Sequence, residues 1–181
     1  MLFRSYHDIW LSESLAEYSA LLELGGRRGN TGAVAKNLAS KRERIFSRLN
    51  DLKKAGPLWL GIRLAAENRE DYNCLVYAKG AYVLHMLRHV MTRRAMDDAG
   101  FFGLLRAMAS RYSWRSITTE DFQALAEELY GDSLDWFFKQ WIYGSDAPLY
   151  RVSHAVMQDS TGAWIIRGKV RQEGVPLHFR M

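Results

Sequence analysis

Two histidines at helical spacing are the first side chains that could do chemistry. His85 and His89 are four residues apart, so a helix would place both imidazoles on one face, as in helices that bind zinc. The metallopeptidase version of that helix needs a glutamate directly after the first histidine as general base, and Met86 stands there instead. We therefore interpret the two histidines as polar residues on one flank of a core helix.

A second segment, Trp10–Tyr18, combines carboxylates with an aromatic residue. Trp10, Glu13 and Glu17 recur at spacings of three and four, so they share one face of a helix. A carboxylate among apolar neighbours is costly unless it is paired or binds a metal. These residues alone leave two readings open: a solvated pair of glutamates, or a buried Glu13 that has a partner.

A third segment reads Tyr-Ala-Lys-Gly-Ala from Tyr77 to Ala81. A tyrosine at the head of an apolar helix is usually a core residue whose hydroxyl is bonded by a neighbour. Taken alone, the segment therefore favours a structural role for Tyr77 over a catalytic one.

Apolar periodicity defines the helices that would position these residues. It predicts helices over residues 8–24, 33–54, 74–93, 98–111, 122–130 and 134–143. Gly25–Gly26 are expected to end the first helix, residues 58–64 to be a short extended stretch, and Thr118 with Asp121 to form a capping box. The breadth of apolar sequence between 74 and 93 predicts a central, largely buried helix.

The pattern changes after residues 144–148. Tyr150, Val152, His154 and Val156 alternate with other residues, and a second alternating run follows from Trp164 to Val170, which is typical of a β-hairpin. We predict a mainly α protein, with a helical domain over residues 1–146 and the first strands of a β domain over 147–181.

Composition excludes several classes of protein. One cysteine among 181 residues excludes an internal disulfide framework, and no apolar run reaches the roughly 18 residues of a membrane span. The formal charge of +5 could suit nucleic acid, but the basic run from Lys41 to Lys54 is interrupted by Glu43 and Asp51 at helical spacing. We interpret it as a solvated helix face and predict no nucleic-acid partner.

Four segments together resemble the aminopeptidase N family of zinc metallopeptidases, the gluzincins that include leukotriene hydrolase. Trp10–Tyr18 is similar to the family's Trp-Leu-Asn-Glu-Gly-Phe-Ala-x-Tyr, and Tyr77–Ala81 to its Tyr-x-Lys-Gly-Ala. Ile117–Phe122 resembles Ile-Thr-Thr-x-Asp-Phe, and Gly131–Trp141 resembles Gly-x-x-Leu-x-Trp-Phe-Phe-x-Gln-Trp. They occur in the family's order, and the resemblance covers most of residues 6–144.

The resemblance implies a fold and a chemistry. It implies the helical lobe of a thermolysin-like catalytic domain, followed by a hairpin from the start of a β-sandwich domain. Glu13 matches the family's third zinc ligand, and Tyr77 matches the tyrosine that hydrogen-bonds the oxyanion of the tetrahedral intermediate. The parent protein would use zinc-activated water to hydrolyse the N-terminal bond of a peptide substrate.

Several departures from the family limit this implication. Ser12, Ser14, Leu15 and Ala78 replace the family's Asn, Gly, Phe and Glu. The His-Glu-x-x-His motif is absent, because the family places it farther upstream than the twelve residues that precede Glu13. We therefore expect a fragment that binds no zinc and has no peptidase activity as an isolated chain. The alternative is a non-catalytic helical interaction module on the same scaffold.

The predicted hairpin also bears on partners. A lone hairpin is marginally stable in water and its unpaired edges invite other strands. We expect self-association through the hairpin edges or through an exposed cleft surface. The polar residues soon after Met1 do not fit a signal peptide, which would lie upstream, so cytoplasm and periplasm of a bacterium both remain open.

Overall fold

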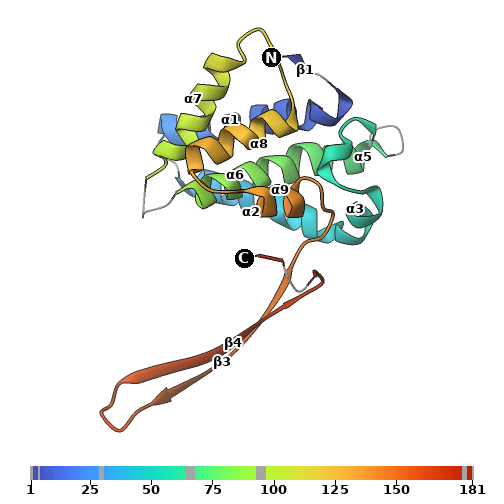
Figure 1. Cartoon of the computed structure of the whole chain (residues 1–181). Helices are drawn as coiled ribbons and strands as arrows, with labels where there is room; N and C mark the ends of the chain where they lie inside the picture. Colours follow the sequence, from blue (N-terminus) through green and yellow to red (C-terminus); the bar gives the residue numbers. More distant parts are fainter. Residues whose placement is uncertain are drawn as a thin grey trace. The chain divides into compact units, whose positions relative to one another are not determined.

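The computed structural model describes residues 2–3, 5–28, 31–63, 68–92, 97–176 and 179–180. The chain divides into two compact units, Met1–Ser145 and Asp146–Met181, which are described separately. The first unit is helical and the second contains an antiparallel hairpin, so the predicted mainly α architecture with a C-terminal hairpin is confirmed (Figure 1).

Helices make up nearly all of the first unit. They are α1 (Ile9–Arg28), α2 (Thr31–Ser47), α3 (Leu49–Ala55), α5 (Arg69–Tyr72), α6 (Gly80–Met91), α7 (Ala99–Arg111), α8 (Thr119–Tyr130) and α9 (Asp135–Trp141). Short turns of 3₁₀ helix occur at η1 (Tyr6–Asp8) and η2 (Leu58–Leu60), and the π-helical turn η3 (Asn73–Lys79) joins α5 to α6. None of the described helices has the length and apolar character needed to cross a membrane.

The core forms where α1 packs against η3 and α6. Trp10, Leu11 and Tyr18 of α1 are buried, as are Val83 and Leu84 of α6. This agrees with the prediction of a central buried helix, although its first part is π-helical rather than α-helical.

The approach of α1 to α6 is close at one pair of small residues. Gly80 has no side chain, and a Cβ added to it would lie 1.9 Å from Oγ of Ser14. That hydroxyl is buried and donates a hydrogen bond of 2.8 Å to the carbonyl of Val76. The missing side chain of Gly80 therefore lets α1 and the start of α6 touch.

Two predicted boundaries are wrong. Gly25–Gly26 do not end the first helix, which continues to Arg28 because the neighbouring packing outweighs the low helix propensity of glycine. A Cβ on Gly25 would lie 3.1 Å from Cγ2 of Val34, so this stretch of α1 lies against α2. The predicted helix over 33–54 is two helices that meet at Arg48, which binds Asp71 (2.5 Å) on α5.

The predicted extended stretch over 58–64 is also different in the structure. Leu58–Leu60 form a 3₁₀ turn, and Leu64 lies outside the described residues. Leu58 is fully buried and the backbone N–H of Trp59 donates to the carbonyl of Ile142. This tertiary contact explains why a local apolar run does not become a strand.

The end of the helical unit follows the local sequence closely. The Thr118 side chain accepts from the backbone of Asp121 and the Asp121 carboxylate accepts from the backbone of Thr118, so the predicted capping box is confirmed. Gly131 ends α8 with φ of 74°, in the left-handed region that favours glycine. A two-residue parallel bridge between β1 (Leu2–Phe3) and β2 (Ser116–Ile117) had no signal in the sequence.

The second unit is a long two-stranded ribbon. Strand β3 (Leu149–Gln158) pairs antiparallel with β4 (Trp164–Glu173), and Asp159 organises the turn by accepting from Thr161 and Ala163. The register places Val152 opposite Val170 and Val156 opposite Ile166. These four side chains share one face of the ribbon and are exposed within this unit.

Candidate functional site

The start of α1 is anchored to the first turn of α8 by buried polar groups. Asp8 accepts hydrogen bonds from the backbone N–H (2.8 Å) and the hydroxyl (3.0 Å) of Thr119. The indole N–H of Trp10 donates to the same hydroxyl at 3.0 Å. These bonds fix the first turn of α1, and Glu13 lies one turn farther along, half-buried.

The structure brings Glu13 of α1 together with Tyr77 of η3. The Tyr77 hydroxyl donates a hydrogen bond to the Glu13 carboxylate, and this bond, with burial and the charge of Glu13, raises the pKa of Tyr77 to about 12. The phenol therefore stays protonated at neutral pH and acts as a hydrogen-bond donor. Of the two readings left open for Glu13, the structure agrees with a carboxylate that has a partner.

Tyr72 completes this small cluster. Its ring meets that of Tyr77 edge-on, with centroids 5.9 Å apart and planes at 83°, and the two side chains also share a hydrogen bond. Burial, followed by the charge of Glu13, raises the pKa of Tyr72. Both phenols are therefore neutral donors beside one carboxylate.

The π-helical turn explains why two tyrosines five residues apart meet. In an α-helix, neighbours on a face are three or four residues apart, so residues at i and i+5 diverge. The i→i+5 bonding of η3 widens the turn and brings Tyr77 back over Tyr72. Such π turns occur frequently at functional sites, and nothing in the local sequence predicted this one.

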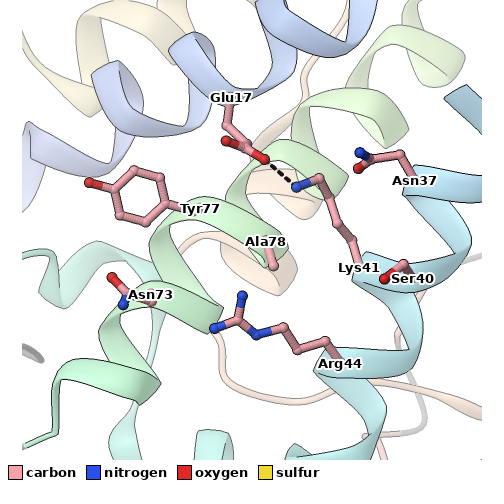
Figure 2. Close-up of a pocket in the computed structure, with 8 residues that line it drawn as sticks. All are labelled: Glu17, Asn37, Ser40, Lys41, Arg44, Asn73, Tyr77 and Ala78. Carbon is pink, nitrogen blue, oxygen red and sulfur yellow. Dashed lines mark hydrogen bonds and ion pairs between the residues drawn. The ribbon is translucent and has the colours of Figure 1, made fainter.

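A cavity of about 460 Å³ adjoins the tyrosine cluster (Figure 2). It lies between α1, α2 and η3 and is lined by Glu17, Asn37, Ser40, Lys41, Arg44, Asn73, Tyr77 and Ala78. Lys41 and Glu17 form an ion pair across it, and the Lys41 side chain is only 13% exposed. The prediction that the basic face of this helix is simply solvated is therefore wrong at Lys41.

The histidine pair lies elsewhere in the helical unit. The ring of His85 is half-buried, with Nδ1 3.1 Å from the hydroxyl of Tyr18, and burial lowers the pKa of His85 to about 4. Nδ1–H of His89 donates to the backbone carbonyl of His85 at 2.9 Å. Both rings are thus bonded within the helical unit on the flank of α6, in agreement with the structural interpretation.

The described residues can be compared with what a zinc site requires. A catalytic zinc ion needs three protein ligands and an open position for water. No group of three histidine, cysteine, aspartate or glutamate side chains suited to a metal occurs within the described part of the chain. Glu13 therefore stands among these residues as a single carboxylate bonded to Tyr77.

Glu13 and Tyr77 are singled out in the sequence, but the residues around them are not. Tyr72 was missed because its contact depends on the π turn. Lys41 was assigned to a solvent-facing helix surface, on which Arg44 is indeed exposed while Lys41 is not. A charge alternation such as Lys41 with Glu43 is the pattern of a solvated face, so the sequence offers no signal that this helix borders a cavity.

Comparisons with known proteins show which family the sequence matches. The sequence model described as the peptidase family M1 domain matches residues 2–141. Transcription initiation factor TFIID subunit 2 of Saccharomyces cerevisiae is 32% identical over 76 residues, which cover 38% of this chain and 5% of that protein. The chain therefore aligns with only a small part of the length of this relative.

Proposed function

This chain belongs to peptidase family M1, and from that premise we propose that it supplies the helical lobe of a zinc-dependent aminopeptidase. The observation that carries the proposal is the hydrogen bond between Glu13 and Tyr77. The two residues are 64 positions apart in sequence, and each matches a functional position of the family by resemblance. Their meeting in one cluster is what a shared reaction centre requires.

We assign the two residues different roles. Glu13 would be the third ligand of a zinc ion, which when bound supplies the Lewis acid that activates water. Tyr77 would donate a hydrogen bond from its hydroxyl to the carbonyl oxygen of the peptide, which becomes negative as the carbonyl carbon is attacked. A phenol is protonated at neutral pH, so Tyr77 can donate in this role, and its hydrogen bond to Glu13 places it beside the proposed ligand.

The remaining parts of the reaction are assigned outside these 181 residues. The sequence contains no His-Glu-x-x-His, so the other two ligands and the general base would come from an upstream segment of a longer polypeptide. We propose that residues 1–146 are the C-terminal lobe of the catalytic domain and that 147–181 begin a β-sandwich domain. The division of contacts near Ser145 supports this boundary.

The first test concerns the isolated 181-residue chain. We expect it to retain well under one zinc ion per chain after metal loading and dialysis, because one carboxylate cannot hold catalytic zinc. It should also release no 4-nitroaniline from leucine 4-nitroanilide. Zinc content is measured by plasma mass spectrometry and hydrolysis by absorbance.

Two variants make this test decisive. Stoichiometric zinc that is lost in Glu13→Gln would contradict the expectation and make Glu13 part of a complete site. Zinc that is lost in His89→Ala would assign the metal to the histidine pair instead. An in-frame upstream His-Glu-x-x-His, whose loss abolishes hydrolysis by the longer polypeptide, supports the aminopeptidase.

A second candidate is a non-catalytic interaction module on the same scaffold. It is favoured by the absence of His-Glu-x-x-His from these residues and by the relative whose name makes it a subunit of a transcription initiation factor. This candidate predicts no metal motif upstream of Glu13. It also predicts that Glu13→Gln and Tyr77→Phe leave the binding of a protein partner unchanged.

We further propose that the isolated chain self-associates. The sequence suggested the hairpin edges or an exposed cleft surface, and the exposed side chains of the ribbon lead us to favour its apolar face. Val152 and Ile166 are 66% and 70% exposed, and Val156 and Val170 lie beside them on the same face. A two-stranded ribbon has no second layer of its own to bury such a face. A second copy could cover it by packing face to face, as the sheets of a β-sandwich do.

A charge placed on that face is expected to weaken association. Ile166→Lys should shift the chain toward the monomer, because burying an unpaired ammonium is unfavourable. Met157→Lys, on the opposite face of the same ribbon, is the matched control and should leave association unchanged. Sedimentation velocity over a concentration series measures both, and a strictly monomeric unsubstituted chain would disprove the proposal.

A further inference from the structure

We propose that the cavity between α1, α2 and η3 binds a carboxylate of a peptide ligand, with Arg44 as the receiving group. The identity of the ligand as a peptide rests on the proposed function. The carboxylate could be the C-terminus of a short peptide or an acidic side chain, since both present the same two oxygens.

The lining of the cavity includes polar side chains that have no protein partner among the described residues. Within the described residues, the side chains of Asn37, Ser40, Arg44 and Asn73 make no hydrogen bond or ion pair, yet all four line the cavity. Figure 2 shows the Arg44 guanidinium reaching from α2 toward η3, near Asn73. Asn37, Ser40 and Arg44 are exposed and Asn73 is half-buried, so these hydroxyl, amide and guanidinium groups are solvated and can exchange water for a polar ligand.

The charges favour a monoanion. Lys41 is neutralised by its ion pair with Glu17, whereas Arg44 is not paired among the described residues. The lining therefore carries a net charge of about +1, counting Lys41 and Arg44 against Glu17. The planar fork of an arginine matches the two oxygens of a carboxylate. A phosphate dianion would exceed the single positive charge, so we favour a carboxylate.

The position of the cavity links it to the tyrosine cluster. Tyr77 lines the cavity and its hydroxyl bonds to Glu13, so one side chain borders both places. In Figure 2 the Tyr77 hydroxyl lies on the side of the ring away from Lys41. A peptide held by its carboxylate at Arg44 would thus extend past the Tyr77 ring toward Glu13. The cavity would then select peptides that carry a carboxylate near the reacting bond.

Binding to the isolated 181-residue chain tests this inference without catalysis. The probes are Ala-Ala-Ala as the free acid, Ala-Ala-Ala-amide, and Ala-Glu-Ala-amide, titrated into labelled protein and followed by NMR. We expect the free acid or the glutamate peptide to bind up to about fivefold more tightly than Ala-Ala-Ala-amide, because Arg44 gains a bidentate partner at an exposed position. Tighter binding of the free acid would identify the carboxylate as a C-terminus, and tighter binding of the glutamate peptide would identify it as an acidic side chain.

Matched variants locate the effect. Arg44→Gln should abolish the preference for a carboxylate, while Arg42→Gln removes the same charge from α2 outside the cavity lining and should preserve it. No binding, equal binding of all three peptides, or a preference that survives Arg44→Gln would overturn the inference.

The outcome is separable from that of the proposed function. If the inference alone fails, Arg44→Gln changes nothing, while Glu13→Gln still abolishes hydrolysis by the longer polypeptide. If the proposed function alone fails, the longer polypeptide does not hydrolyse peptides, while the carboxylate preference and its loss in Arg44→Gln remain.

Discussion

Tyr77→Phe is expected, on the proposed function, to lower kcat/KM of a longer polypeptide that carries the other zinc ligands by about 10²–10³-fold, the usual cost of removing one positioned donor to an oxyanion. The substitution removes only the hydroxyl that bonds to Glu13 and leaves the ring that packs against Tyr72. Most of the loss should fall on kcat, because the donor acts on charge that develops in the transition state. Steady-state hydrolysis of leucine 4-nitroanilide measures it.

Tyr72→Phe is the matched control for this prediction. It removes a hydroxyl from the neighbouring tyrosine of the same cluster, five residues earlier on the same helical run. We expect a much smaller loss, since only Tyr77 matches the family's catalytic position. Equal losses in the two variants would mean that the cluster acts structurally, and a loss below about tenfold in Tyr77→Phe would remove this tyrosine from catalysis.

Local patterns predicted the elements of the fold well where local chemistry decides the structure. The apolar stripes gave the helices, the capping box set the start of α8, and alternation after residue 148 gave the hairpin. Predictions were wrong where a distant contact decides, as at Gly25–Gly26, which remain helical beside Val34, and at Leu58, which is buried in a 3₁₀ turn.

The candidate site shows the same contrast between features set by local sequence and features set by distant contacts. Residue types marked Glu13 and Tyr77 as candidates, but only the resemblance linked them, because a glutamate and a tyrosine 64 residues apart have no shared local pattern. Their contact depends on how α1 lies on η3, and the contribution of Tyr72 depends on a π turn. Lys41 illustrates the limit most clearly, since its burial arises from helix packing and not from its sequence neighbours.

Gly80→Ala is expected to destabilise the helical unit by about 1–3 kcal/mol, the range for overpacking a filled core. The new Cβ would lie 1.9 Å from Oγ and 2.8 Å from Cβ of Ser14, so α1 and α6 would have to separate. Urea denaturation followed by far-ultraviolet circular dichroism measures the change. Gly103→Ala on α7 is the control: its Cβ would meet no atom within 4 Å, so the higher helix propensity of alanine should make it neutral or slightly stabilising.

Ser14→Gly should reverse the sign of the Gly80→Ala effect. By itself, Ser14→Gly removes the hydrogen bond to Val76 and adds a flexible residue within α1, so it should cost about 1–2 kcal/mol. Once the serine side chain is gone, its atoms no longer obstruct the Cβ at position 80, and the nearest remaining contact is an ordinary 3.7 Å to the carbonyl of Leu75. Gly80→Ala should then be neutral or stabilising by up to about 1 kcal/mol, because alanine replaces glycine inside a helix. Additive effects of the two substitutions in the double-mutant cycle would show that α1 and α6 do not meet at this pair.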